Sequence, residues 1–330
     1  MSESEEYSLI ILGKVNPEAP LPSDIYLHVD KKYIKFRSKG DMITQQKFDL
    51  FISKGVKNLY VKNEDIMMFL EWISETAEEE IEGLVAEGGE ENRGVFERSA
   101  GMKEKVYDVF IEEELSTETV GVIQEQVASF VEGIQDDPLA AKAIRALMEK
   151  NASIADHSVN VANLAVYLGM ALGHGHQFVL ENIYMGSIFH AYGKAKIPAH
   201  LLENSGDRLY SQAINDHPLT GCKVIEKSSG VPKQVFSIIR QHHEQWNGGG
   251  YPQGLKADEI YDLAQVVALA NTFDNLLQEH KRLPQAEKFK RAIKYIEMQN
   301  GKMFSPKLYP RVLDALKLAF GNFKRDTVVS

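Results

Sequence analysis

Two adjacent histidines, His242 and His243, are the residues whose type and spacing point most directly to chemistry in this chain. A polar, glycine-rich turn follows them and reads Asn247-Gly248-Gly249-Gly250-Tyr251-Pro252. Neighbouring imidazoles are difficult to bury unless each ring nitrogen has a partner, and an open loop beside them gives a ligand access. The pattern therefore predicts a site that something must enter.

Three further histidines, His157, His190 and His217, precede this pair. Their intervals are too long for a finger-type zinc motif, so they can meet only where several helices pack together. His190 ends an apolar helical pattern and is followed by Gly193, which places it where a helix breaks open. His157 lies on an apolar helical face, where a lone histidine is more often a core residue than a ligand.

The N-terminal part of the chain must supply a different kind of structure, because residues 7–60 show short, strand-like patterns. Strands are predicted at 9–12, 25–29, 33–36 and 57–61, with a turn at Asp30-Lys31-Lys32. Helices are predicted at 45–53 and around Ile66, Phe69, Leu70 and Ile73. These elements predict a small α/β module, in which no catalytic constellation is evident.

The middle of the chain changes character. Residues 75–92 are acidic and contain Gly88-Gly89, which predicts a solvated helix end and a linker. Ser116 can cap the next helix. The apolar stripe of this helix suits either an intradomain contact or a homodimer contact, and it consists of Val120, Ile123, Val127, Phe130 and Ile134. Asp137-Pro138 is a further helix start.

From Asp137-Pro138 onward the patterns are helical, so the fold class is α+β overall. We predict an N-terminal α/β module over residues 1–75, a linker and connector helices over 76–150, and an all-α domain over 151–330. A fragment from about Pro138 to Ser330 is expected to fold alone.

Composition excludes several partners. The chain has 330 residues, 44% hydrophobic content and a net charge of −10, so neither nucleic acid nor an anionic membrane is expected as the main partner. Cys222 is the only cysteine, which rules out an internal disulfide. No apolar run approaches the roughly 18 residues of a membrane span, and the start Met1-Ser2-Glu3 is acidic, so a cytoplasmic protein is expected.

The histidine segments together resemble the HD-GYP family. The run His190-Ala191-Tyr192-Gly193-Lys194 is similar to the family's His-Asp-Ile-Gly-Lys segment, and His217-Pro218-Leu219-Thr220-Gly221 is similar to its next histidine segment. His242-His243-Glu244 through Gly250-Tyr251-Pro252 matches the motif that names the family. The resemblance extends from about Ser153 to Pro306.

The resemblance implies an all-helical, metal-dependent phosphodiesterase that hydrolyses cyclic-di-GMP. It implies one or two divalent transition-metal ions, iron or manganese before zinc, held by His157, His190, His217, His242, His243 and, through an amide oxygen, Asn271. Lys194 would bind the substrate phosphate and assist catalysis, and the loop Gly250, Tyr251 and Pro252 would lie against the substrate.

The sequence departs from the family pattern at its acidic ligands. Ala191 and Asn271 stand where the family has aspartates, Ser153 replaces a glutamate found in some members, and His280-Lys281-Arg282 replaces an Arg-Pro-Tyr segment. Two divalent ions ~3.7 Å apart repel by roughly 18 kcal/mol at a dielectric of 20, which bridging anions must offset. His217, His242 and His243 can still hold one ion as a three-imidazole set.

Three functions are compatible with these residues. The first is an active phosphodiesterase with an altered metal set. The second is a degenerate member that binds cyclic-di-GMP, a related phosphodiester or a partner protein without hydrolysing it. The third is a protein-interaction scaffold in which the cluster is structural. The retained histidines and Lys194 favour metal and phosphate binding, whereas the absent acids weigh against ordinary turnover.

Overall fold

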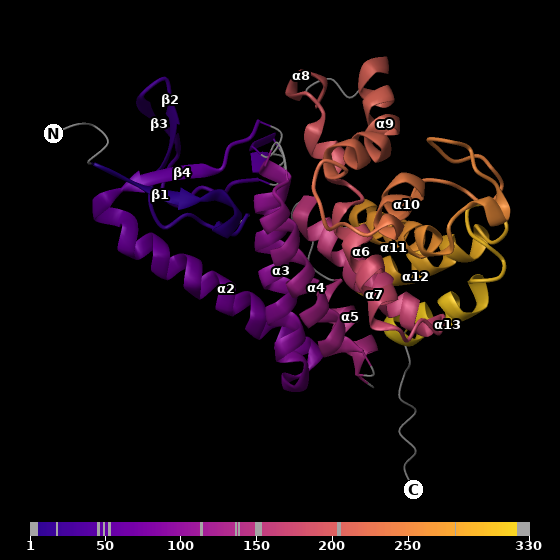
Figure 1. Ribbon diagram of the computed structural model, residues 1–330. Coiled ribbons are helices and arrows are strands. Elements are labelled where there is room, and N and C mark those ends of the chain that lie inside the picture. Colours follow the sequence, from indigo (N-terminus) through magenta and orange to yellow (C-terminus); the bar gives the residue numbers. More distant parts are fainter. Residues whose placement is uncertain are drawn as a thin grey trace, which may run out of the picture.

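The N-terminal module is a four-stranded antiparallel sheet in the order β1-β4-β2-β3 (Figure 1). The computed structural model describes residues 6–17, 19–44, 47–48, 50–51, 54–112, 115–135, 137, 139–148, 154–202, 206–280 and 282–321. The strands are β1 (Tyr7–Ile11), β2 (Ile25–Val29), β3 (Lys32–Arg37) and β4 (Asn58–Lys62), which confirms the predicted strands. Asp30 and Lys31 both have positive φ, as the tight turn of the β2-β3 hairpin requires.

One face of the sheet forms the module's core. Ile10, Ile25, Leu59 and Val61 are buried there, and Phe69 of α2 (Ile66–Gly88) is buried with them. The predicted helix over 45–53 lies partly outside the described residues, and the described residues Lys47, Phe48, Leu50 and Phe51 are helical.

The predicted solvated helix end at residues 75–92 is confirmed, but most of the stretch is helix rather than linker. Helix α2 continues through the acidic run to Gly88 and buries Ile81, Leu84 and Gly88. Glutamate favours helices and can remain solvated on the outer face, so the acidic composition reflects an exposed helix surface rather than a break. The actual connection is Gly89, at φ 92°, and a 3-10 turn over Glu90–Asn92.

The connector helices share the core of the helical part. Helix α3 (Arg93–Ile111) packs against α6 (Ile154–Ala171), and α4 (Thr117–Ile134) packs against α3 and α7 (Gln177–Phe189). Ser116 accepts a hydrogen bond from the Thr119 amide at 2.9 Å, which confirms the predicted cap. The whole apolar stripe of α4 is buried, and Phe130 lies 4.8 Å from Tyr184 between ring centroids. The stripe is therefore an intradomain contact.

The remaining helices complete an all-helical domain, as predicted (Figure 1). Helices α6 and α7 are its buried centre, and α11 packs across α6. None of the described helices is both long and apolar enough to cross a membrane. The other helices are α5 (Ala140–Leu147), α8 (Ala199–Leu202), α9 (Arg208–Ile225), α10 (Lys233–Gln241), α11 (Asp262–Glu279), α12 (Gln285–Met298) and α13 (Tyr309–Phe320).

Candidate metal centre

The five predicted histidines come from four helices and meet at one place. His157 is near the start of α6, His190 directly follows α7, His217 is within α9, and His242 and His243 directly follow α10. The chain of ring contacts is continuous: between centroids, His157 lies 5.1 Å from His190, His190 lies 5.0 Å from His242, His242 lies 5.3 Å from His217, and His217 lies 5.1 Å from His243. Tertiary packing thus brings together residues that are far apart in sequence.

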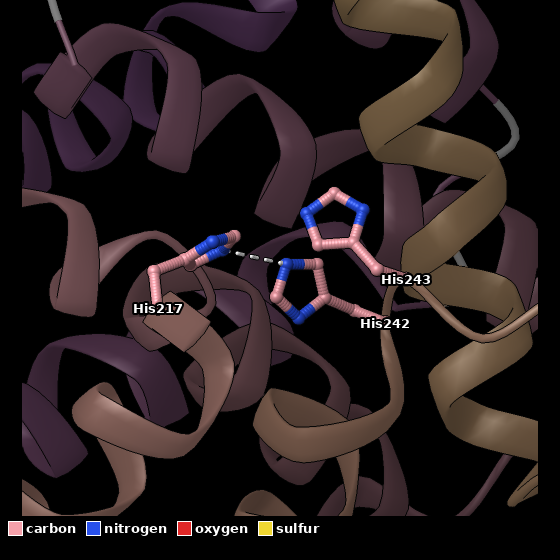
Figure 2. Close-up of side chains that lie close together, drawn as sticks. All are labelled: His217, His242 and His243. Carbon is pink, nitrogen blue, oxygen red and sulfur yellow. Dashed lines mark hydrogen bonds between the residues drawn. The ribbon is translucent and has the colours of Figure 1, made fainter. Parts of the chain in front are cut away.

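His217, His242 and His243 form the tightest group (Figure 2). One nitrogen from each ring lies within 4.8 Å of the others, and the Nε2 atoms of His217 and His242 are 3.3 Å apart. Three converging imidazole nitrogens are a common ligand set for zinc and other first-row transition metals.

Backbone carbonyls orient three of the rings. The Nδ1 atoms of His190, His217 and His242 lie 2.6, 2.5 and 2.7 Å from the carbonyl oxygens of Ser187, Ile214 and Ile239. An Nδ1–H that donates to a carbonyl leaves Nε2 with its lone pair, which is the tautomer a metal ligand needs. Each Nε2 therefore faces the cluster as an acceptor.

The sequence itself frees the carbonyl that orients His217. Pro218 has no N–H, so the carbonyl of Ile214 loses the helical hydrogen bond it would receive four residues later. His217 occupies that carbonyl instead. For His190 and His242 the helix ends serve the same purpose, because the last carbonyls of α7 and α10 lack helical partners.

Burial keeps the cluster neutral. Desolvation is the main cause that lowers the pKa of His217 to about 3 and of His243 to about 2, and it lowers the pKa of His190 and His242 as well. At neutral pH these imidazoles hold no proton that a metal would have to displace. Among the described residues, the buried Nε2 of His243 has no hydrogen-bond partner.

His157 is held by a carboxylate. Its Nδ1 lies 2.6 Å from Oδ2 of Asp274, a fully buried residue of α11. Asp274 therefore lies in the interior behind a cluster histidine and does not face solvent. A carboxylate behind a histidine orients the ring, which leaves Nε2 of His157 directed toward Nε2 of His190, 3.2 Å away.

The positions that lack an acid are also buried. Ala191 is fully buried beside His190, and Asn271 is 3% exposed. Asn271 precedes Asp274 by three residues on α11 and so shares its helix face. Its Oδ1 accepts a hydrogen bond from Asn275 at 3.0 Å and keeps one lone pair. Its role as a ligand stays a prediction.

Lys194 follows the His190 segment in a 3-10 turn, Tyr192–Lys196, that lies close against α9. A Cβ on Gly193 would collide with the carbonyl oxygen of His217, so only glycine permits this approach. Desolvation lowers the pKa of Lys194, and its ammonium group forms no hydrogen bond or ion pair with the described residues. A desolvated cation without a counter-ion favours an anionic ligand.

The Gly250-Tyr251-Pro252 loop rests on His243. The Tyr251 ring stacks on the His243 ring at 4.6 Å, its amide donates to the carbonyl of His243 at 3.2 Å, and the Tyr251–Pro252 peptide bond is cis. A Cβ on Gly250 would collide with backbone atoms of His243, Glu244 and Gln245. The loop therefore covers one side of the cluster in a way that requires glycine at position 250.

Glu244 holds this loop, although the sequence assigned it no role. Its side chain is 3% exposed and accepts hydrogen bonds from the amides of Gln253 at 2.7 Å and Leu255 at 2.9 Å. Its position directly after His242 and His243 was the available signal, because an acid beside a predicted buried cluster must find partners. For Asp274 the signal was similar, an acid among the buried apolar residues of α11.

The donor set fits a metal ion. It combines three convergent neutral imidazoles, carbonyl contacts that orient His217 and His242, and a buried ring nitrogen of His243 that lacks a partner among the described residues. The identity and number of ions stay predictions.

Comparison with known proteins agrees with this arrangement. Residues 138–308 match the family model described as HD domain. A cyclic di-GMP phosphodiesterase of Thermotoga maritima is 28% identical over 173 residues, which are 52% of this chain and 46% of that protein. A cyclic di-GMP phosphodiesterase response regulator of Xanthomonas campestris is 34% identical over 138 residues, 41% of this chain and 35% of that protein. The chain thus spans less than half the length of either relative.

A solved structure shares the fold of almost the whole chain. It is an HDGYP protein of Bdellovibrio bacteriovorus with a TM-score of 0.63 and 22% sequence identity, and the match covers 94% of this chain and all of that one. The shared fold therefore includes both the sheet module and the helical domain.

Proposed function

This chain belongs to the HD domain family, and from that premise we propose that its histidine cluster is the metal-dependent phosphodiesterase site of a cyclic-di-GMP signalling protein. The observation that carries the proposal is the convergence of five histidines beside Lys194, a desolvated cation that pairs with no acid among the described residues. The two relatives described above are named for action on cyclic di-GMP, which supports this substrate class.

We assign one metal ion to His217, His242 and His243, and a second position to His157 and His190, with Asn271 as the nearby amide ligand. Iron and manganese are preferred, with zinc as the alternative. When bound, such ions polarise phosphoryl oxygens and lower the pKa of water. The chain supplies oriented rings, and the Asp274 carboxylate fixes the orientation of His157.

Lys194 and the Tyr251 loop define the substrate side. The Lys194 ammonium would neutralise a phosphate of the dinucleotide, because it lies beside the histidines without a counter-ion among the described residues. The loop presents Tyr251 on the face of His243, next to the same space.

Hydrolysis is limited by the missing acids. Position 191 offers only a buried methyl group and position 271 a neutral amide, so no carboxylate can bridge two cations there. We infer that the chain binds metal and phosphodiester more effectively than it turns the substrate over. The same observation favours the second candidate function, a receptor that binds cyclic-di-GMP without hydrolysing it.

The metal assignment is tested by elemental analysis of the purified chain. Replacing His242 and His243 by alanine should remove the metal, whereas His174→Ala, a histidine outside the cluster, should leave the metal content unchanged. Circular dichroism must show that the double variant keeps its helices. A folded double variant with unchanged metal content would contradict the assignment.

The catalytic part is tested by restoring the acids. Ala191→Asp with Asn271→Asp adds two negative charges, so metal occupancy should rise toward two ions and the phosphodiesterase rate should rise with it. Of the two single changes, Ala191→Asp should raise metal occupancy and rate more than Asn271→Asp, because its carboxylate stands where the family has the aspartate that bridges two metal ions. A simple phosphodiester is assayed beside cyclic-di-GMP, since the Arg-Pro-Tyr segment is absent.

Asn300→Asp is the matched control for each single change, because it adds one negative charge at an exposed position. Rapid metal-dependent hydrolysis by the unaltered chain would refute the inference that the acids limit it. Cyclic-di-GMP binding without hydrolysis, in both the unaltered chain and the restored variant, would establish the receptor function.

A further inference from the structure

A large cleft lies outside the histidine cluster, between the sheet module and the connector helices. Its volume is about 810 Å³, which is within the range of small-molecule sites. Four segments line it: residues 13–17 after β1, helix α2, helix α3 and Asp156 of α6. Because the N-terminal module and the helical domain both contribute walls, the cleft exists only in the assembled chain.

One wall of the cleft is apolar. Helix α2 presents Leu70, Ile73, Ala77 and Ile81 along one stripe, and Leu70 remains 48% exposed. The opposite wall leaves open space at Gly101 of α3, where an added Cβ would lie more than 4 Å from any atom outside its own helix. The stripe of α2 is thus only partly covered by protein, which leaves apolar surface for a ligand.

The polar part of the cleft is negative. Lys103 is centred between Glu80 and Asp156, at 3.1 Å from a carboxylate oxygen of each, and its side chain is 13% exposed. Lys14 pairs with Glu104 at 3.3 Å, so its charge is balanced. The lining includes four carboxylates and two lysines: Glu78, Glu80, Glu104, Asp156, Lys14 and Lys103. Arg93 pairs with Glu78 at 3.4 Å, so the excess is the one negative charge that remains when Glu80 and Asp156 share Lys103.

An anionic ligand would meet this excess of carboxylates, whereas a cation can bind beside Glu80 and Asp156. We propose that the cleft binds a small organic cation, an ammonium group attached to an apolar body. The ammonium group binds at the Glu80 and Asp156 carboxylates and the body packs on the α2 stripe. This site is separate from the proposed phosphodiesterase function and does not depend on it.

The position of the cleft connects it with the metal centre. Asp156 immediately precedes His157 in the first turns of α6, so an occupant of the cleft touches the turn that carries a cluster histidine. The two sites lie on opposite sides of that turn, one formed with α3 and the other with α11.

The test uses 2-phenylethylamine as the cationic probe, with phenylacetate as its anionic counterpart of similar size. Binding is measured on the full chain by calorimetry and by ligand-observed NMR at millimolar concentration, without any activity assay. For a probe of this size we expect a Kd of about 1 mM for the amine, and binding at least about tenfold weaker for the acid.

Two leucine substitutions provide a matched pair. Gly101→Leu fills the cleft and should weaken amine binding at least about tenfold, whereas Gly121→Leu on α4 also projects into open space but lies outside the cleft and should leave binding unchanged. Glu80→Gln should weaken the amine while Asp156 still holds Lys103.

Each outcome is decisive. Saturable amine binding that is lost in Gly101→Leu and kept in Gly121→Leu supports the site. Equal binding of amine and acid, amine binding that survives Gly101→Leu, or no binding of either probe would overturn it. Because no metal or substrate is needed, these results do not depend on whether the histidine cluster hydrolyses a phosphodiester.

Discussion

Replacing Glu244 by glutamine tests how the loop over the histidine cluster is held. The carboxylate of Glu244 is 3% exposed and accepts hydrogen bonds from the Gln253 amide at 2.7 Å and the Leu255 amide at 2.9 Å. Glutamine has the same shape but keeps only one acceptor oxygen. Its NH₂ group must face one of the two backbone N–H groups, so one hydrogen bond is lost and two donors oppose each other.

The size of the effect follows from these contacts. A hydrogen bond to a charged group contributes about 1.5–3 kcal/mol, and a buried donor left without a partner costs about 1–3 kcal/mol. A local destabilisation of roughly 3 kcal/mol is a modest estimate from these two contributions. It corresponds to an increase of roughly 100-fold in the opening equilibrium of the loop.

Hydrogen exchange followed by NMR is the assay, because it reports the Gln253 and Leu255 amides individually. Both amides should exchange roughly 100-fold faster in Glu244→Gln, and the stacking of Tyr251 on His243 should be lost with them. Glu259→Gln is the control, since Glu259 accepts a single hydrogen bond, from the exposed Lys256 amide, at 2.8 Å. Its effect should stay within about 0.5 kcal/mol. Unchanged exchange in Glu244→Gln would refute the assignment of the carboxylate as the loop's anchor.

Three further predictions concern stability and metal binding. The metal-free chain should lose stability as the pH falls below about 6.5, because the pKa values of four histidines are lowered in the folded state and the unfolded chain therefore takes up protons first: His190, His217, His242 and His243. Each of these histidines should lower the free energy of unfolding by about 1.4 kcal/mol per pH unit. Equal urea midpoints at pH 7.5 and pH 5.5 would contradict this prediction. Asp274→Asn should weaken metal binding that involves His157 by about 10–100-fold, measured by metal titration, while an equal affinity would show that His157 is not a ligand. A fragment from Pro138 to Ser330, expected from the sequence to fold alone, lacks α3 and α4 and exposes the surface of Tyr184 that Phe130 covers, so its thermal transition should be broad. A chain that starts at Arg93 keeps both helices and should unfold cooperatively. A sharp thermal transition of the shorter fragment would instead support the expectation from the sequence.

The predicted three-part division of the chain stays a prediction, but the packing shows where pattern reading reached its limit. The acidic stretch at residues 75–92 has the composition of a linker and the structure of a helix. An acidic composition shows only that these side chains need contact with water, and both a solvated helix face and a linker provide that contact. Burial of Ile81 and Leu84 against the rest of the fold decides between the two.

The sequence by itself determined the strands, the turn at Asp30-Lys31, the cap at Ser116 and the convergence of five histidines, because these depend on local periodicity, local backbone geometry and motif order. It also determined that Ala191 and Asn271 carry no charge. Only the tertiary structure decided that Asp274 holds His157, that Glu244 anchors the loop and that α4 is buried within the chain. The physical reason is that a carboxylate's partner lies wherever helices cross, and the crossing of α6 by α11 is set by packing between residues more than a hundred positions apart.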